Sequence, residues 1–232
     1  MADTAVIAGH GPGFCEAFAW KLAEEGHPVA LFARSESYLA DFETRLRDAG
    51  HEALAVPTDI TDTEALVEGL GRVREELGPI EVLALTASTN PESSGELDPD
   101  RFEAMWKLYT KASLDAVRAT LDDLRETNGT VLFFGANPDM ADYAYRSAKA
   151  GARELARTLA NEYGPDGIHV AHVIIDDYML NPDVYELLDE VVEEDCIDPE
   201  EAAKTCYHLV EQADRGRTFE LDLHSATGFE IR

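Results

Sequence analysis

Short apolar runs alternate with longer segments of helical periodicity along the whole chain. Seven of these runs are bounded by turn-forming residues, and several are nearly all apolar, as buried parallel strands require. The predicted strands are Thr4–Ala8, Pro28–Ala33, Ala53–Val56, Val82–Leu85, Val131–Phe134, Val170–Ile175 and Phe219–Leu223. Strands that alternate with helices form a parallel sheet covered on both faces. The pattern therefore predicts an α/β fold with one doubly wound sheet of about seven strands.

Polar residues mark where several of the intervening helices begin. Thr61-Asp-Thr-Glu64 has the form of a capping box before a helix over Ala65–Leu77. Asp98-Pro99 begins a helix that we expect to run to about Thr127, and Asp198-Pro199 begins the last one.

The length of 232 residues suits one α/β domain with a full core. No repeat, low-complexity segment or linker divides the chain, so we expect a single domain over residues 1–232. Three scattered cysteines, Cys15, Cys196 and Cys206, predict neither a disulfide framework nor a metal site, which fits a reducing cytosol. No apolar run approaches the ~20 residues of a membrane span. The first residues lack the basic region of a signal peptide, so we expect a cytoplasmic protein.

The charge is strongly acidic, with 47 acidic and 19 basic residues and a net charge of −28. Such a surface repels nucleic acid and anionic membranes, so we expect neither as a partner. Solubility alone is one interpretation. Adaptation to high salt, as in a halophilic organism, is favoured because acidic residues are spread over nearly every predicted helix. The Debye length falls to ~3 Å at 1 M salt, where this self-repulsion is largely screened.

The first predicted strand runs into a glycine-rich turn, Gly9-His10-Gly11-Pro12-Gly13-Phe14-Cys15, and then into a helix over Glu16–Glu25. Glycines at such a junction let backbone amides approach a pyrophosphate at the positive end of the helix. A plain glycine-rich turn is the alternative, but the strand before and the helix after favour a dinucleotide site. We therefore predict a Rossmann-type domain in which Gly9, Gly11, Gly13 and Phe14 bind the cofactor.

The second predicted strand ends at Ala33 and is followed by Arg34. An acidic residue there would accept from a ribose 2′-hydroxyl and favour NAD, whereas Arg34 suits a 2′-phosphate. We predict NADP, with NAD as the alternative if Arg34 is an ordinary surface arginine. Asp59, after the third strand, either accepts from the adenine amino group or simply precedes the next helix. The other predicted cofactor contacts are Ile60, Ala87, Ile175, Tyr145 and Lys149.

Tyr145 and Lys149 are spaced i,i+4 near the start of a helix that we expect to end at about Tyr163. This spacing places the phenol and the ammonium on one helix face. A tyrosine with a pKa near ~10 is a poor acid or base at neutral pH. An adjacent lysine and a positively charged nicotinamide would lower that pKa, so that the tyrosine protonates a carbonyl oxygen while hydride arrives. The pair alone is common on helices, and Tyr143 and Tyr163 lack the partner lysine.

Together, the glycine turn, Asp59, the Tyr145/Lys149 pair and the closing strand resemble the short-chain dehydrogenase/reductase family over the whole length. The chain is most similar to a bacterial and archaeal branch whose turn reads Gly-x-Gly-Pro-Gly and which carries an Ile-Asp pair like Ile175-Asp176. The resemblance implies an NAD(P)-dependent oxidoreductase acting on a carbonyl or alcohol, usually a homodimer or homotetramer. It implies Tyr145 as acid/base, and Lys149 as ribose binder and pKa modifier.

The chain departs from the family pattern at several functional positions. The third turn glycine is Cys15, the relay asparagine is Tyr109, and the Asn-Asn-Ala-Gly motif is Leu85-Thr86-Ala87-Ser88. The catalytic serine has no counterpart from Val131 through Asp142. Asn137 is a candidate substitute, although a turn asparagine before proline is the simpler interpretation.

Three functions fit these residues. The first is an NADP(H)-dependent reductase or dehydrogenase for a small carbonyl or alcohol. The second is a catalytically impaired dinucleotide-binding protein, because the family serine is missing. The third is a sugar-nucleotide epimerase or dehydratase, which the short chain after the sixth strand disfavours. Asp176–Ile197 is the expected substrate region, and its acidic residues favour a neutral or cationic substrate. Its apolar residues Tyr178, Met179, Leu180 and Tyr185 either contribute to substrate binding or only cover the core.

Overall fold

Seven parallel strands form one sheet in the order β3-β2-β1-β4-β5-β6-β7. The computed structural model describes residues 2–89, 97–136, 142–182, 184–187 and 192–226. The strands are β1 (Thr4–Ala8), β2 (Val29–Ala33), β3 (Ala53–Pro57), β4 (Ile80–Leu85), β5 (Thr130–Ala136), β6 (His169–Ile175) and β7 (Glu220–Leu223). All seven predicted strands and the doubly wound fold are confirmed, because runs buried on both faces are easy to read in a sequence.

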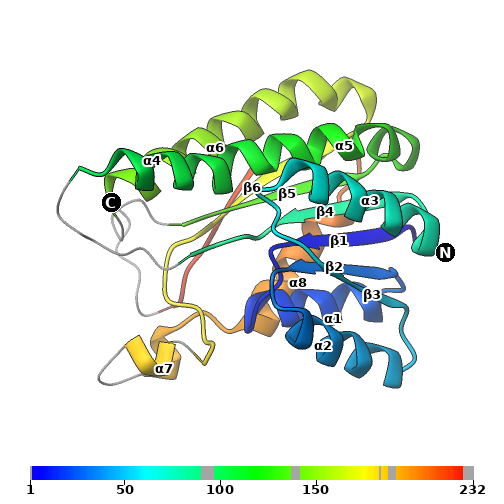
Figure 1. The fold of residues 1–232 in the computed structure, drawn as a ribbon, viewed down its shortest axis with the longest axis horizontal. Coiled ribbons are helices and arrows are strands. Elements are labelled where there is room, and N and C mark those ends of the chain that lie inside the picture. Colours follow the sequence, from blue (N-terminus) through cyan, green and yellow to red (C-terminus); the bar gives the residue numbers. More distant parts are fainter. Residues whose placement is uncertain (1, 90–96, 137–141, 183, 188–191, 227–232) are drawn as a thin grey trace.

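Helices cover both faces of the sheet (Figure 1). One layer holds α1 (Phe14–Glu24), α2 (Glu36–Asp48) and α8 (Pro199–Val210), and the other holds α3 (Thr63–Leu77), α4 (Pro99–Trp106), α5 (Ala112–Thr127) and α6 (Tyr143–Tyr163). Short helices are α7 (Val184–Leu187) and two 3₁₀ turns, Gly164–Asp166 and Glu193–Asp195. The side chains of each strand alternate between the two layers, so Ile7 packs in one core cluster and Val6 in the other.

The predicted helix starts are correct for α4 and α8, whereas α3 begins two residues earlier than predicted and its predicted cap is off by one residue. Asp98 and Asp198 cap their helices by accepting from backbone amides. For α3 the cap is Asp62, whose carboxylate accepts from the amides of Glu64 and Ala65 at 3.0 and 3.2 Å. The predicted capping box at Thr61 is therefore wrong: Thr61 donates to Asp59 instead.

The helix expected from Asp98-Pro99 to about Thr127 is interrupted in its middle. Between α4 and α5 the backbone makes a π-helical turn, Lys107–Lys111, with the buried Tyr109 at its centre. Such a turn inserts an extra residue and changes which side chains face inward, and it is frequent at functional sites.

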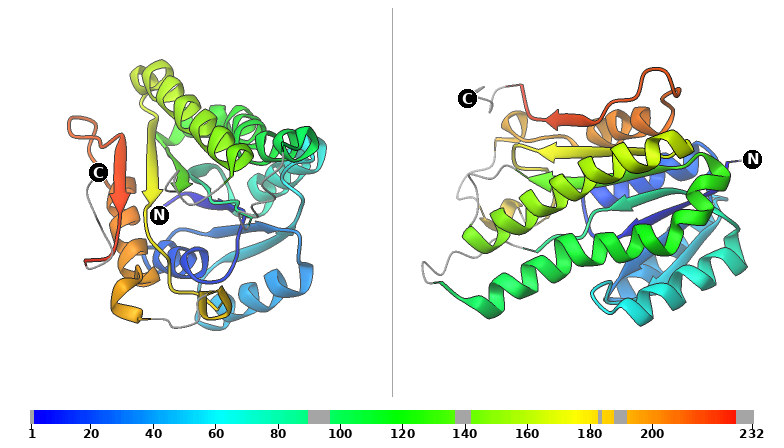
Figure 2. Two further views of the ribbon diagram at one scale, coloured as in Figure 1. Left: turned by 90° about the vertical axis from the view of Figure 1, so that its left-hand side faces the viewer. Right: turned by 90° about the horizontal axis from the view of Figure 1, so that it is seen from above.

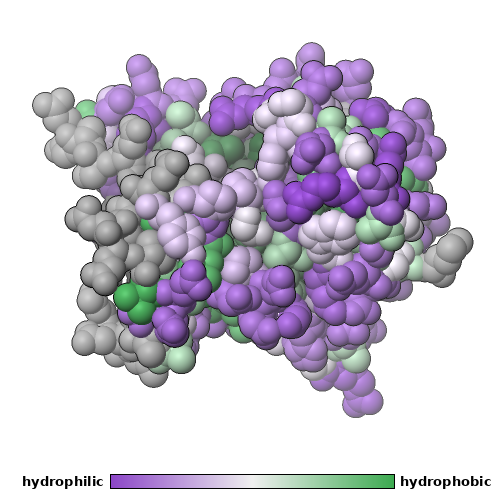
Figure 3. Space-filling view, turned by 90° about the horizontal axis from the view of Figure 1, so that it is seen from below, coloured by the Kyte–Doolittle hydropathy of each residue, from purple (hydrophilic) through white to green (hydrophobic). Residues whose placement is uncertain are grey.

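All strands point the same way, so the segments that follow them meet at one end of the sheet (Figure 2). The strand order reverses between β1 and β4, and ligands of open α/β sheets bind at such a switch point. The face formed by α1, α2 and α8 is mostly hydrophilic (Figure 3). No helix in the described residues is both long and apolar enough to cross a membrane.

Candidate functional site

A cavity of about 780 Å³ lies at the switch point, at the carboxyl ends of β1, β2, β3 and β4. Six of the predicted cofactor contacts line it: Gly9, Gly11, Arg34, Asp59, Ile60 and Ala87. Segments far apart in sequence are thus brought together around one volume, which is within the usual range for a small-molecule site.

The three glycines of the turn have different roles. Gly9 has φ +111°, and a Cβ there would overlap the backbone of Ala87, so this glycine lets the end of β4 pack on the turn. Gly13 has φ +79°, and a Cβ there would lie 2.8 Å from the Asn181 Cβ. A Cβ at Gly11 would meet nothing within 4 Å. Gly11 is therefore the glycine that leaves backbone open to the cavity.

The amino end of α1 has no side-chain cap, because its N-cap residue is Gly13. Amides in the first turn of a helix have no intrahelical acceptor, and together with the helix dipole they form an anion site. Cys15, which stands where the family has a glycine, donates its thiol to the carbonyl oxygen of Gly9 at 3.6 Å. The sulfur thus connects the helix to the turn.

Five of the predicted cofactor contacts do not line this cavity, and two of these are Tyr145 and Lys149. Gly13 packs against the segment that follows β6. Phe14 is 8% exposed and lies 4.9 and 5.5 Å, between ring centroids, from Phe134 and Phe18. Ile175 packs against the same core cluster. The side chains of Phe14 and Ile175 therefore serve the core in this structure.

At the outer end of the cavity a carboxylate is surrounded by donors and cations. Asp59 accepts from the amide and the hydroxyl of Thr61 at 2.9 and 2.8 Å. The amide hydrogen bond from Thr61 is the main cause that lowers the pKa of Asp59, and Arg34 and Lys107 contribute. Two cationic side chains beside one carboxylate are notable in a chain with a net charge of −28. They make this end suitable for a phosphate group.

The sequence did not identify the other residues that line the cavity. They are His10, Pro12, Phe32, Ala33, Ser35, Tyr38, Thr58, Thr61, Ser88, Thr89, Ala104, Met105, Lys107 and Leu108. Several adjoin predicted contacts, so the strand ends were the available signal. The residues from Ala104 to Leu108 gave no such signal, because the π-helical turn and the packing of α4 bring them to the cavity.

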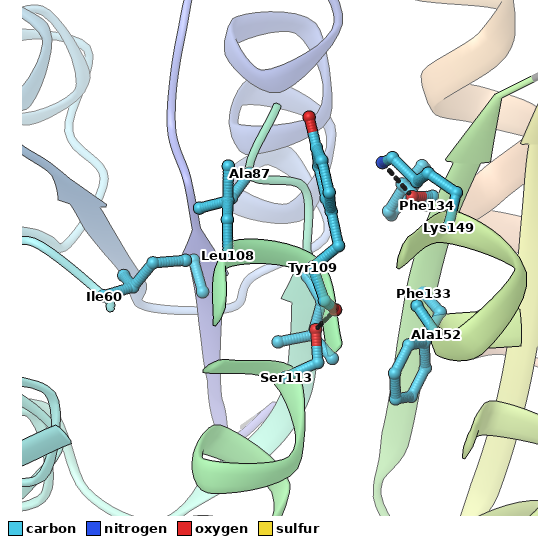
Figure 4. A pocket seen from close by; sticks show the side chains of 11 residues that line it. Ile60, Ala87, Leu108, Tyr109, Ser113, Phe133, Phe134, Lys149 and Ala152 are labelled. Carbon is cyan, nitrogen blue, oxygen red and sulfur yellow. Dashed lines mark hydrogen bonds between the residues drawn. The ribbon is translucent and has the colours of Figure 1, made fainter. Parts of the chain in front are cut away.

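Tyr145 and Lys149 lie together on α6 as predicted, and both are buried, at 6% and 9% exposure. The Lys149 Nζ donates to the carbonyl oxygen of Phe134 at 2.8 Å. It lies 4.1 Å from the ring centroid of Tyr109 and 5.6 Å from that of Tyr145. Figure 4 shows the Tyr109 ring between Ala87 and Lys149, in a narrow recess that shares Ile60, Ala87 and Leu108 with the large cavity. Lys149 therefore lines a recess that adjoins the cavity, whereas Tyr145 does not line it.

Burial controls the ionisation of both members of the pair. It lowers the pKa of Lys149 to about 7, because the ammonium is removed from water. Burial raises the pKa of Tyr145, the Tyr109 phenol adds to this rise, and a hydrogen bond from Ser88 opposes it. The expected lowering of the Tyr145 pKa by Lys149 is thus not found in this structure, where Tyr145 is a neutral phenol.

Tyr109 occupies the position of the family's relay asparagine. Its hydroxyl accepts from the amide of Thr89 at 2.9 Å, and its ring lies 5.2 Å from the Tyr145 ring, edge on. Its side chain fills space beside Lys149, as the 4.1 Å approach of Nζ shows. The relay asparagine is therefore replaced by a group that packs between the pair and the cavity.

Part of the region where the family serine was sought is described. Val131 through Ala136 belong to β5 and include no hydroxyl side chain. Asn137, the candidate substitute, lies outside the described residues. A second cavity of about 110 Å³ is lined by Gly135, Tyr145, Arg146, Lys149, Ala150, Arg153, His172 and Ile174.

The expected substrate region, Asp176–Ile197, is described except for residues 183 and 188–191. Its Leu180 and Asn181 pack on Gly13, and Met179 forms a β-bridge with Ile197. Tyr178 and Tyr185 are largely exposed. Within the described residues, no group of three or more His, Cys, Asp or Glu side chains is placed to hold a metal ion.

Comparisons with known proteins agree with this geometry. A family model described as short chain dehydrogenase matches residues 3–176. Cis-4-hydroxycyclohexanecarboxylate dehydrogenase of Sinomonas cyclohexanicum is 32% identical over 72% of this chain and 69% of its own length. For 2,3-dihydro-2,3-dihydroxybenzoate dehydrogenase of Bacillus subtilis the identity is 28%, over 68% of this chain and 63% of the relative.

Solved structures extend the similarity to nearly the whole chain. An alcohol dehydrogenase from Thermococcus sibiricus, complexed with 5-hydroxy-NADP, has a TM-score of 0.85 at 25% identity and 99% coverage of both chains. L-sorbose reductase from Gluconobacter frateurii, complexed with NADPH and L-sorbose, has a TM-score of 0.88 at 22% identity, covering 99% of this chain and 98% of its own. At that identity the second similarity shows the fold alone.

Proposed function

The chain belongs to the short chain dehydrogenase family, and we propose that it is an NADP(H)-dependent oxidoreductase for a small carbonyl or alcohol. The observation that carries this proposal is that Lys149, one turn from Tyr145 on α6, lines a recess that shares Ile60, Ala87 and Leu108 with the 780 Å³ cavity at the switch point. In the proposed reaction Tyr145 is the acid/base. Lys149 binds the ribose and modifies the pKa of the Tyr145 phenol.

The residues around the cavity fit a nicotinamide dinucleotide phosphate. Gly11 leaves backbone open, the uncapped start of α1 suits the pyrophosphate, and Arg34 with Lys107 suits a 2′-phosphate. The 5-hydroxy-NADP in the name of the Thermococcus sibiricus structure supports the same choice. NAD remains the alternative if Arg34 does not bind phosphate.

When bound, the cofactor would supply or accept the hydride, and the protein's own part is the proton. Because the pKa of Tyr145 is raised, the phenol holds its proton throughout the neutral range. A neutral phenol is the form that donates a proton to a carbonyl oxygen. The site in this structure is therefore suited to carbonyl reduction at neutral pH, whereas alcohol oxidation needs the phenolate and a higher pH.

Turnover of NADPH with a panel of neutral carbonyl compounds tests the proposal. The wild type should oxidise NADPH, and Tyr145→Phe should lose this activity while still binding the cofactor. Tyr143→Phe is the matched control, because Tyr143 lies two residues away on α6 and its hydroxyl donates to the Asp98 carbonyl at 3.0 Å. Equal turnover in wild type and Tyr145→Phe would contradict the proposed chemistry.

A dinucleotide-binding protein without turnover is the second candidate. The observation in its favour is that β5 offers no serine and that Tyr109 replaces the relay asparagine. Cofactor binding without NADPH oxidation, across the whole panel and in wild type as well as Tyr145→Phe, would support this candidate.

We also propose a single domain over residues 1–232 that forms a homodimer or homotetramer in the cytoplasm. The family resemblance supports the oligomer, and the scattered cysteines support a reducing compartment. The acidic charge supports adaptation to high salt, as in a halophile. Size-exclusion chromatography with light scattering tests the oligomer.

A further inference from the structure

The cavity of about 110 Å³ lies beside the Tyr145/Lys149 pair and shares no lining residue with the 780 Å³ cavity. Of these two cavities and the recess, it is the one that Tyr145 lines. A carbonyl oxygen that receives the Tyr145 proton has to lie in contact with that residue. The volume corresponds to about four water molecules at ~30 Å³ each, so this cavity can hold a molecule of a few carbon atoms.

His172, on β6, forms part of the wall of this cavity, although it is only 4% exposed. The Nε2 edge of its ring lies against Gly135 of β5, where a Cβ would be 2.6 Å from Nε2. Any larger residue at position 135 would therefore displace the imidazole. The strand in which the family serine was sought thus carries a glycine here, and the neighbouring strand supplies a polar ring in the space that is left open.

The other ring nitrogen of His172 faces a carboxylate that is held in place. Nδ1 is buried, makes no hydrogen bond within the described residues, and lies 3.6 Å from Oε2 of Glu220 on β7. Arg153 fixes Glu220, because its Nε and Nη2 each donate to one carboxylate oxygen at 2.5 Å. These hydrogen bonds are the main cause that lowers the pKa of Glu220, so the carboxylate is ionised at neutral pH. Its negative charge favours a proton on Nδ1, although 3.6 Å is longer than a hydrogen bond.

With its proton on Nδ1, the imidazole presents Nε2 as an acceptor. Burial lowers the pKa of His172 to about 4, Glu220 opposes this shift, and Arg153 and Lys149 add to it, so the ring is neutral at neutral pH. A neutral imidazole has one N–H group and one acceptor nitrogen. Within the described residues Nε2 has no hydrogen-bond donor. Because a buried acceptor without a partner is costly, a ligand of this cavity should bring a hydroxyl group to Nε2.

The other polar side chains that line the cavity are donors. Arg146 and Arg153 have no acceptor atom, and the Lys149 Nζ already donates to the backbone of β5. Tyr145 gives its proton to the carbonyl oxygen in the proposed reaction. The lining side chains therefore offer donors to a carbonyl group and, in His172, an acceptor to a hydroxyl group.

We propose that the 110 Å³ cavity binds the substrate, and that His172 holds it by accepting, at Nε2, a hydrogen bond from a hydroxyl group beside the reacting carbonyl. The substrate class is then the small hydroxyketones, which are reduced to diols. The reduction adds one hydride, from NADPH as in the proposed function, and one proton, from Tyr145, across the carbonyl bond. The hydroxyl group on His172 keeps its proton, so His172 binds and orients the substrate. This inference rests on the proposed oxidoreductase function, because it names the substrate class of the same site.

Hydroxyacetone and acetone differ by one hydroxyl group, and the ratio of their kcat/KM values tests the inference. This ratio should fall about 10-fold in His172→Leu, as expected for the loss of one hydrogen bond that acetone does not make. His208→Leu removes an exposed imidazole from α8 and should leave the ratio unchanged. An unchanged ratio in His172→Leu would overturn the inference.

Gly135→Ala displaces the imidazole without removing it, and it provides a second test should His172→Leu fail to fold. The added Cβ would come within 2.6 Å of Nε2, so the ratio should fall here as well. Gly71→Ala is the matched control, because a Cβ at this position of α3 meets nothing within 4 Å. A folded Gly135→Ala protein with the wild-type ratio would contradict the placement of the substrate against His172.

A binding measurement without turnover separates this inference from the proposed function. The ¹⁵N resonance of His172 Nε2, assigned by its loss in His172→Gln, responds to hydrogen bonds at that nitrogen. Hydroxyacetone should move this resonance at neutral pH and acetone should not, and no movement with hydroxyacetone would overturn the inference. Movement without oxidation of NADPH by any carbonyl compound would instead reject the proposed function and leave the hydroxyl site standing.

Discussion

Lys149 donates a hydrogen bond of 2.8 Å from its Nζ to the carbonyl oxygen of Phe134. The ammonium is held by the backbone of β5 and lies over the Tyr109 ring. This arrangement fixes the α6 lysine against the sheet. It also places a chargeable group in a site that disfavours charge, which has a measurable effect on stability.

Stability should rise with pH because of Lys149. Its pKa falls from 10.5 to about 7 on burial, so between these values the unfolded chain binds more protons than the folded one. The free energy of unfolding therefore increases as pH rises through this window. Lys149→Met should remove that increase and raise the stability at pH 7, although turnover should be lost. Urea unfolding from pH 6.5 to 10 measures the slope.

The surface lysine Lys204 provides the control for this prediction. Its ammonium pairs with Glu201 at 2.6 Å on α8, where the side chain is largely exposed. Lys204→Met should leave the slope of the wild type in place. A Lys149→Met slope that matches the wild-type slope would show that the folded state does not bury a neutral lysine.

The first two glycines of the turn should respond differently to alanine. Gly9→Ala forces a Cβ into the Ala87 backbone at φ +111°, so it should lower the melting temperature strongly, by the several degrees that about 2 kcal/mol or more represents. Gly11→Ala adds a methyl group to open space and should melt as the wild type does. Because that methyl group enters the cavity, it should weaken NADPH binding. Thermal melts and fluorescence titration measure the two effects.

The same pair of variants distinguishes packing from phosphate binding as the reason for each glycine. A stable, folded Gly9→Ala protein with weak cofactor affinity would contradict the packing role. A destabilised Gly11→Ala protein would contradict the open space at that position.

The fold could be predicted from the sequence because the apolar strand runs and the short motifs that indicate it are local in the chain. Runs such as Ala5–Ala8 are apolar throughout, since each face of the strand enters a core cluster. The glycine turn and the Tyr145/Lys149 spacing are local as well. Gly9 and Gly11 line the cavity, and Lys149 lines the recess that adjoins it.

The rest of the site depends on contacts between distant segments. Lys107 reaches the cavity because of a π-helical turn that no sequence pattern predicted. Tyr109 meets Tyr145 only because the π-helical turn packs against α6, and the two residues are 36 positions apart in the chain. Phe14 looked like a cofactor contact by its place in the motif, yet aromatic packing turns it into the core. The Lys149 hydrogen bond to Phe134 likewise could not be read from the spacing of the pair.

Arg34 should decide the choice of cofactor. It lies at the end of β2, in the cavity, and acts on Asp59 together with Lys107. Arg34→Ala should weaken NADPH binding by about 10- to 100-fold, as expected for the loss of a charge-assisted hydrogen bond to phosphate, with little change for NADH. Arg215→Ala, at an exposed position outside the cavity lining, is the control. Equal losses for the two cofactors would argue against a 2′-phosphate site at Arg34.

Added salt should raise the melting temperature of this protein, because it screens the repulsion among the acidic side chains. The chain carries 47 acidic and 19 basic residues, and several ion pairs of the described residues are exposed at both partners, such as those between Arg72 and Glu76 and between Lys204 and Glu201. Exposed pairs contribute little, so net repulsion among carboxylates dominates the surface. Potassium chloride screens this repulsion, and the melting temperature should therefore rise between 0.1 and about 1 M salt, as the Debye length falls to ~3 Å. Differential scanning calorimetry measures it, with sucrose of equal osmolality as the uncharged control. A melting temperature that rises equally in sucrose would assign the effect to exclusion of solute, and one that stays constant in salt would reject the adaptation.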